Sequence, residues 1–266
     1  MSARARAERG LENKNVMPRA GIALLSCVFF AGAAHAQSEM AQRLTKEHVG
    51  DIEPGSYTAG HTSFTLDLYG DKYLIRFAGD PEVYVLYADH APLGGRALKF
   101  DSGAIVIRVA GWGGMTLYTS DAPSGVPAER TGDTITPSLA PVTLFDMQNA
   151  ADDESQHLAY SRRVHLNFTA DWNALAGDVR LRALAFDAME NVSRGIDRFL
   201  TIPKGRDAFA KRIEQVRLGL GNKPVMFMSG KTLTITFNAQ AGYAGRASSR
   251  GIARALGQIL QVNVPD

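Results

Sequence analysis

Hydrophobic and polar residues alternate along the first half of the chain. A period of two over a short run is typical of a β-strand with one buried face. Turn sequences rich in glycine and aspartate separate the runs at intervals of roughly ten residues. The alternating runs lie at 64–68, 73–77, 83–87 and 105–109. Short strands at this spacing predict an antiparallel β sandwich or a small barrel.

The second half combines helical periodicity with a hairpin pattern. Asp171 is a suitable N-cap for a long helix, and Ser229-Gly230-Lys231 is a suitable turn between two alternating runs. The expected elements are a strand at 164–168, helices at 171–199, 207–220 and 249–261, and a hairpin at 225–237. The predicted fold class is therefore α+β, with an N-terminal antiparallel β sandwich or small barrel followed by a helical half that contains a β-hairpin.

Between the two halves the pattern is less regular. Prolines interrupt the segment from 121 to 141, and residues 142–145 are expected to form one more strand. Residues 149–156 include three consecutive acidic residues and no large apolar side chain, which predicts a linker or an exposed loop. The expected boundary therefore separates a β-rich half at 37–150 from an α+β half at 151–266, which we expect to pack together.

The first 36 residues have the pattern of a secretory signal peptide. Arg19 precedes the apolar run at 21–34, which is too short to cross a bilayer, and Ala-His-Ala follows it. We expect cleavage after Ala36, with translation starting at Met1 or Met17, and a periplasmic or secreted location. Lipidation of Cys27 is the rival interpretation, but the apolar run continues through that cysteine.

The two halves differ in charge. Residues 37–159 hold 8 Lys and Arg against 17 Asp and Glu, a net charge of −9, whereas residues 160–266 hold 16 against 8, a net charge of +8. Cys27 is the only cysteine, and it lies within the predicted signal peptide. A cleaved chain would therefore carry no disulfide, no thiolate nucleophile and no cysteine-ligated metal.

No known catalytic motif is present in the sequence. His-Glu-x-x-His, Gly-x-Ser-x-Gly and Ser-x-x-Lys are absent, so the sequence predicts no catalytic residue, metal or cofactor. His90 beside Asp89 is interpreted as a surface-loop residue. For Asp80 and Glu82 we favour a turn cap and a solvated carboxylate over an acid–base pair. Trp112 is either a sugar-stacking platform or, as we favour, a side chain folded over the edge of the core.

The most suggestive stretch is GYAGRASSRGIARAL at 242–256. A glycine-containing loop leads into a predicted helix, whose N-terminal N–H groups attract anions. The candidate site for a phosphate or carboxylate consists of Gly245, Arg246, Ser248, Ser249 and Arg250. We expect the two arginines to be exposed and to contribute little to stability. The alternative, which we favour, is that a serine simply caps the helix.

Three short motifs are shared with a known family. They are Phe77 with GDPEV at 79–83, GGMTLY at 113–118, and GYAGRASS at 242–249. On these residues the chain resembles an exported Gram-negative bacterial family that is catalogued only as a domain of unknown function. The resemblance implies one exported unit and brings no ligand and no catalytic residue.

These features favour a non-enzymatic envelope-associated or interaction protein. Its expected partner is an anionic envelope component or another envelope protein; nucleic acid is not expected, and neither is a membrane-spanning segment. The alternative is an envelope hydrolase with a dispersed active site, acting on peptidoglycan or another anionic polymer. A pocket that joins both halves and contains a perturbed carboxylate or histidine would favour the enzyme.

Overall fold

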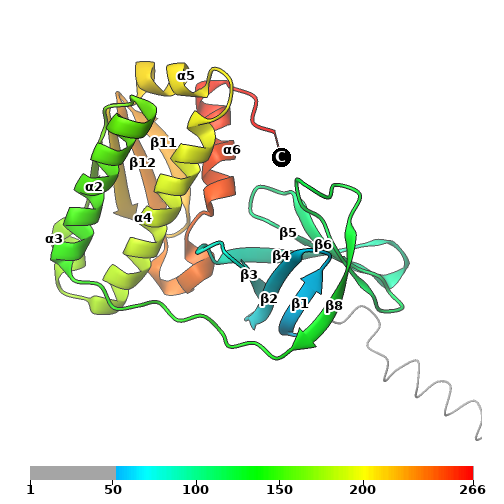
Figure 1. The fold of residues 1–266 in the computed structure, drawn as a ribbon. Coiled ribbons are helices and arrows are strands. Elements are labelled where there is room, and N and C mark those ends of the chain that lie inside the picture. Colours follow the sequence, from blue (N-terminus) through cyan, green and yellow to red (C-terminus); the bar gives the residue numbers. More distant parts are fainter. Residues whose placement is uncertain (1–51, 266) are drawn as a thin grey trace, which may run out of the picture. The chain divides into compact units, whose positions relative to one another are not determined.

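A closed barrel of eight antiparallel strands forms the first half of the computed structural model, which describes residues 52–265. Each strand pairs with the next, and β8 pairs with β1 to close the barrel (Figure 1). The strands are β1 (Gly55–Ala59), β2 (Thr62–Tyr69), β3 (Lys72–Phe77), β4 (Tyr84–His90), β5 (Arg96–Lys99), β6 (Ile105–Val109), β7 (Met115–Leu117) and β8 (Val126–Gly132). The predicted α+β fold is confirmed, with the barrel as its first part. The predicted signal peptide, Cys27 and the cleavage position lie outside the described residues.

The first part of β4 is buried on both of its faces, whereas its last four residues are exposed. Tyr84 and Leu86 point into the barrel core, where they are 1% and 0% exposed. Val83 and Val85 belong to a separate cluster that contains Tyr243 from the second half of the chain. This outer cluster is one of the places where the barrel contacts the α/β half.

The second half is a four-stranded sheet with helices. The sheet order is β11-β12-β10-β9, with β10 parallel to both of its neighbours and β11 antiparallel to β12. Helices α2 and α4 lie across one face of the sheet in Figure 1. The elements are α2 (Leu144–Arg162), β9 (Asn167–Ala170), α3 (Trp172–Ala176), α4 (Val179–Leu200), α5 (Gly205–Arg212), β10 (Gln215–Leu220), β11 (Val225–Ser229), β12 (Thr232–Phe237), η2 (Ala239–Gly245) and α6 (Ser249–Leu260). The predicted hairpin and last helix are confirmed.

Two predictions about the middle of the chain are wrong. The segment 142–156 is neither a strand nor a linker, because Thr143 and Asp146 form a capping box that starts α2. Met147, Ala151 and Leu158 give this helix a narrow buried face, while Asp146, Asp152 and Asp153 are exposed. The low hydrophobicity of the segment thus reflects a mostly exposed helix.

Two helix predictions also need correction. The helix expected at 207–220 ends at Arg212, and residues 215–220 form β10 in the middle of the sheet, where Val216 and Leu218 are buried at a period of two. The helix expected at 171–199 is divided at Gly177. Asp171 caps the short α3, and Asp178 caps α4.

Helices α4 and α6 approach each other closely. A Cβ atom on Gly195 would lie 2.5 Å from Ile252, so only glycine permits this crossing. The crossing fixes the start of α6 against α4, which matters for the site described below. Among the described residues, no helix combines the length and the hydrophobicity that crossing a bilayer requires.

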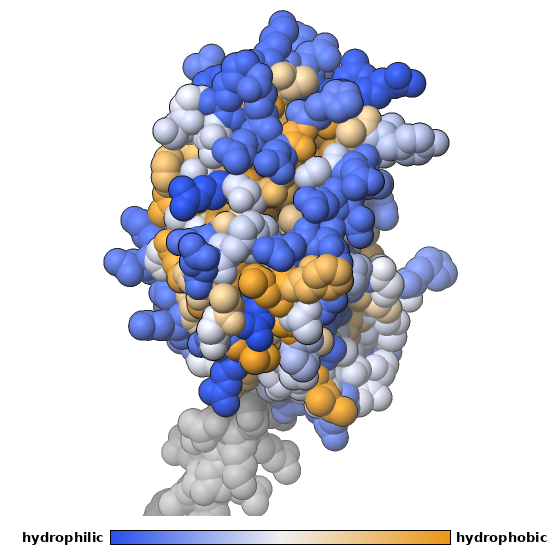
Figure 2. Space-filling model, turned by 90° about the vertical axis from the view of Figure 1, so that its left-hand side faces the viewer, coloured by the Kyte–Doolittle hydropathy of each residue, from blue (hydrophilic) through white to orange (hydrophobic). Residues whose placement is uncertain are grey.

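The surface over α2 and α3 is mainly hydrophilic, with hydrophobic side chains interspersed in the lower half of the view (Figure 2). Exposed apolar side chains on α2 include Phe145 and Tyr160, which are 69% and 92% exposed. Isolated apolar residues of this kind are common on protein surfaces. They give no indication of a partner.

Candidate functional site

The N-terminus of α6 holds two carboxylates that come from the barrel. Ser248 is the N-cap residue, and its hydroxyl accepts a hydrogen bond from the Gly251 N–H at 3.1 Å. The same hydroxyl donates to Asp101 Oδ1 at 2.5 Å, and the Ser248 N–H donates to Asp101 Oδ2 at 2.7 Å. The serine cap is confirmed, and it also binds the turn between β5 and β6 to α6.

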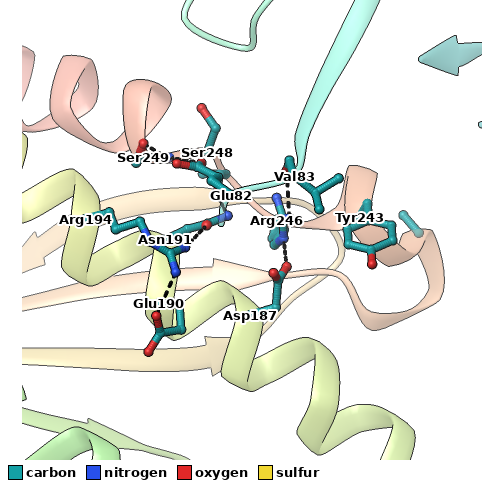
Figure 3. Close-up of polar contacts among 12 residues, drawn as sticks. Glu82, Val83, Asp187, Glu190, Asn191, Arg194, Tyr243, Arg246, Ser248 and Ser249 are labelled. Atoms are coloured by element: carbon teal, nitrogen blue, oxygen red, sulfur yellow. Dashed lines mark hydrogen bonds and ion pairs between the residues drawn. The ribbon is translucent and has the colours of Figure 1, made fainter. Parts of the chain in front are cut away.

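Glu82 makes the equivalent contact with the next serine (Figure 3). The Ser249 N–H donates to Glu82 Oε1 at 2.8 Å, and the Ser249 hydroxyl donates to Oε2 at 2.5 Å. Glu82 is 0% exposed, so the expectation of a solvated carboxylate is wrong. Burial raises the pKa of Glu82 above its ordinary value, although the hydrogen bonds from Ser249 and the charge of Arg246 act in the opposite direction.

Arg246 is buried beside this pair, with 4% of its surface exposed. Its Nε donates to the Asp187 carboxylate of α4, and its Nη2 donates to the Val83 carbonyl of the barrel at 2.9 Å (Figure 3). Its guanidinium also lies 5.3 Å from the centre of the Tyr243 ring. The expectation that Arg246 is exposed is therefore wrong. Its guanidinium links Asp187 of α4 to the Val83 carbonyl of the barrel.

The loop before α6 is positioned by close backbone contacts. A Cβ atom on Gly245 would lie 1.9 Å from the Asn238 carbonyl oxygen, which excludes a side chain at this position. The Asn238 N–H donates to the Gly245 carbonyl at 2.7 Å. Asn191, which is 0% exposed, donates from Nδ2 to the Ala247 carbonyl at 3.2 Å.

The predicted anion site therefore separates into two parts. Arg246, Ser248 and Ser249 contact the barrel, and the anions that the structure shows beside them are the chain's own carboxylates. Gly245 instead packs against Asn238. Binding of an external anion at those residues stays a prediction. Arg250 has a different environment, which leads to a separate pocket.

Arg250 lies over the Phe100 ring at 4.7 Å from its centre, and its buried Nε has no hydrogen-bond partner among the described residues. Its side chain lines a pocket of 270 Å³ together with Arg198 and Arg254. We call this the three-arginine pocket. Arg250 and Arg254 share one face of α6 because they are four positions apart, and Arg198 lies near the end of α4.

The lining of the three-arginine pocket comes from both halves of the chain. Ser102 and Ser120 of the barrel and Thr201 after α4 contribute hydroxyl groups, and the remaining four lining residues are apolar. No aspartate, glutamate or histidine is among the described residues that line it. Arg254 donates to the Ser102 carbonyl, and Arg198 Nη2 donates to the Tyr84 hydroxyl at 3.0 Å, so these two guanidinium groups are held in place.

Comparison with protein families gives one match. Residues 36–256 match the family described as Domain of unknown function (DUF4908). The chain belongs to this family. A search of curated proteins and a search of solved structures found no match for this DUF4908 chain.

In this DUF4908 domain, the turn before β4 supports Arg198, which lines the three-arginine pocket. Asp80 caps the turn as predicted, because its Oδ1 accepts the Glu82 N–H at 2.9 Å. Its Oδ2 accepts the Tyr84 hydroxyl at 2.9 Å, and that hydroxyl in turn accepts from Arg198. Burial, followed by the charge of Glu82, raises the pKa of Tyr84, so this tyrosine is neutral at physiological pH.

Two other candidates from the sequence lie elsewhere in the DUF4908 domain. His90 is exposed, as expected, but it is the last residue of β4 and pairs with Arg96 of β5, so it does not lie in a loop. Trp112 is 80% exposed, so the expectation that it folds over the core edge is wrong. Within residues 52–265, no cluster of three or more His, Cys, Asp or Glu side chains is arranged to hold a metal ion.

Proposed function

We propose that this protein is an exported, envelope-associated protein that binds an anionic component in the three-arginine pocket and does not act as an enzyme. The observation that carries the proposal is the lining of that pocket, which comprises three arginines, two serines and a threonine and, among the described residues, no carboxylate. Guanidinium groups bind phosphate and carboxylate through paired hydrogen bonds. A volume of 270 Å³ suits one charged group and its immediate substituent, and is below that of most drug-sized sites.

The same lining favours binding over the alternative of an envelope hydrolase. General acid–base catalysis needs a side chain that exchanges a proton near the operating pH, usually histidine or a carboxylate. The three-arginine pocket contains neither among its described residues. Glu82 has a raised pKa, but it is fully buried and its two oxygens accept hydrogen bonds from Ser249.

A ligand titration tests the binding function. We expect inorganic phosphate or pyrophosphate to raise the melting temperature of the wild type in a concentration-dependent manner, because a ligand that binds only the folded state stabilises it. The double variant Arg250→Gln/Arg254→Gln should lose this response. Arg206→Gln, which changes an arginine that is exposed on α5, should keep it. An absent response in the wild type, or an equal response in the double variant, would refute the proposal.

Export is the second part of the proposal and rests on the pattern at 17–36. We expect mass spectrometry of the purified periplasmic fraction to give a mature N-terminus at Gln37 without a lipid. A diacylated Cys27 would contradict cleavage after Ala36, and recovery of the intact chain in the cytoplasm would contradict export.

A further inference from the structure

Two neighbouring turns at one end of the barrel expose large apolar side chains. Leu93 lies in the short 3₁₀ turn η1 (Pro92–Gly94) between β4 and β5, and it is 81% exposed. Trp112 lies in the turn between β6 and β7, and it is 80% exposed. We call these two residues the Leu93–Trp112 tip. Exposure of two large apolar side chains side by side needs an explanation that single exposed residues do not.

Close backbone contacts hold the two turns together. A Cβ atom on Gly111 would lie 2.1 Å from the Leu93 carbonyl oxygen, and one on Gly95 would lie 2.6 Å from the Val109 carbonyl oxygen. Leu93 itself has a φ of 59°, in the left-handed region that leucine rarely adopts. The backbone is therefore strained at Leu93, and the close contacts leave no room for side chains at Gly95 and Gly111. In this arrangement both apolar side chains are exposed to solvent.

A basic pocket lies directly behind the tip. It has a volume of 510 Å³, and both tip residues line it together with Lys99, Arg108 and His90. The described lining contains no carboxylate. Arg108 lies 5.4 Å from the centre of the Tyr118 ring. Lys99 is paired with Asp89 at 2.6 Å, so one acidic side chain does lie close to the rim.

We propose that the Leu93–Trp112 tip docks on the surface of an anionic phospholipid membrane. Tryptophan and leucine on loops are suited to the boundary between headgroups and acyl chains, where an indole ring keeps its N–H in a polar layer. The cations behind them then face the lipid phosphates, which gives charge complementarity. This inference concerns a different site from the three-arginine pocket and does not depend on anion binding there.

A soluble sugar is the other ligand that an exposed tryptophan can take. Stacking on a sugar ring requires a flat aromatic face, which Trp112 supplies and Leu93 does not. Because Leu93 is as exposed as Trp112 and cannot stack on a sugar ring, the composition of the tip favours a lipid surface. The experiment below separates the two ligands.

The test uses the full chain without its signal segment, in a Trp172→Phe background that leaves Trp112 as the only tryptophan. Vesicles contain equal parts of phosphatidylglycerol and phosphatidylcholine, or phosphatidylcholine alone. We expect Trp112 emission to shift to shorter wavelength, to be quenched by brominated acyl chains, and the protein to sediment with the anionic vesicles. Binding to the neutral vesicles should be weaker.

Variants identify the residues that make the contact. Leu93→Asn introduces a residue that tolerates positive φ and removes the apolar side chain, so it should fold and bind anionic vesicles about tenfold more weakly. Trp112→Ser should weaken sedimentation to a similar degree. Ile135→Ser removes an apolar side chain that is 85% exposed elsewhere and should bind like the wild type. Arg206→Gln removes an exposed charge on α5 and should also bind like the wild type.

Three results would overturn the inference. The first is that neither kind of vesicle sediments the protein. The second is that Leu93→Asn and Ile135→Ser bind equally well. The third is that soluble oligosaccharides shift the Trp112 emission while vesicles do not, which would assign the tip to a glycan.

Discussion

Glu82 and Ser249 are separated by 167 positions in the sequence and are joined by two hydrogen bonds, from the Ser249 N–H and from its hydroxyl. The serine begins the last helix, and the glutamate comes from the turn before β4. A carboxylate at the N-terminus of a helix interacts favourably with the free N–H groups there. Burial of Glu82 is therefore compensated locally by the helix that it contacts.

Ser249→Ala should lower the free energy of unfolding by about 1–3 kcal/mol, because a buried carboxylate loses a charge-assisted hydrogen bond. Urea denaturation measures the change. The matched control is Ser161→Ala, which removes an exposed hydroxyl that donates to the His157 carbonyl within α2. The control should change stability by less than about 0.5 kcal/mol. Equal effects of the two variants would show that the Glu82 contact adds nothing.

Glu82→Gln should change how stability depends on pH. Burial raises the pKa of Glu82 in the folded state above its ordinary value of 4.5, so the folded state binds this proton more tightly than the unfolded state. The stabilisation is then fully present below pH 4.5 and is lost as the pH rises through the folded pKa. Between pH 4.5 and the folded-state pKa, the free energy of unfolding of the wild type should fall relative to that of Glu82→Gln, by at most about 1.4 kcal/mol per pH unit. Urea denaturation of both proteins at several pH values gives the difference, and parallel curves would contradict the prediction.

Arg246→Met should destabilise the protein by about 3–5 kcal/mol, because it leaves the Asp187 carboxylate without its partner in a mostly buried position. Adding Asp187→Leu should restore much of the loss, because no charge then remains unpaired. Arg206→Met is the control, since Arg206 and Asp207 have exposed side chains and their pair is worth about 0–1 kcal/mol. If the loss of unfolding free energy in the double variant equals the sum of the losses in the two single variants, Arg246 and Asp187 do not stabilise the protein as a pair.

Gly245→Ala should lower stability by more than about 2 kcal/mol, because the new Cβ atom would overlap the Asn238 carbonyl oxygen. Gly219→Ala is a matched control, since a Cβ atom there meets nothing within 4 Å. Thermal unfolding of both variants distinguishes them. A melting temperature of Gly245→Ala within experimental error of the wild type would show that the loop before α6 can relax.

Local patterns in the sequence predict the elements that have a clear hydrophobic face. Four barrel strands, β2, β3, β4 and β6, follow alternating runs, and α6 carries a serine cap followed by an apolar stripe, so these elements are predicted correctly. The sequence does not predict β1, β5, β7 and β8 individually. Helix α2 buries only three residues and was missed for that reason, although Thr143 and Asp146 offer a capping signal. The sequence predicts one helix across α5 and β10 because β10 follows α5 after only two residues, although Val216 and Leu218 alternate as in a strand.

The candidate site was harder to predict, because its contacts join residues far apart in the chain. The sequence indicates that the start of α6 attracts an anion, and it does not indicate that Glu82 and Asp101 supply that anion. A charged residue near a glycine-rich loop is usually exposed, and Arg246 is an exception that depends on Asp187 and Val83. The spacing of Arg250 and Arg254 was available as a signal for the pocket, whereas the position of Arg198 follows only from the packing of α4 against α6.

Asp101 and Glu82 of the barrel each bind a serine at the start of α6. We therefore expect the barrel to form before α6 docks on it. Every barrel strand pairs with its neighbour in sequence, and only the β1–β8 pair closes over a longer distance, so the barrel can form from contacts close in the chain. Glu82 precedes Ser249 by 167 positions, so it reaches the compartment where the chain folds first, whether folding takes place at the ribosome or after export. The last helix therefore meets a surface on which both of its carboxylates are already in place. The amide hydrogen of Ser249 should become protected from exchange only in this final step, which makes it a marker for the completed molecule.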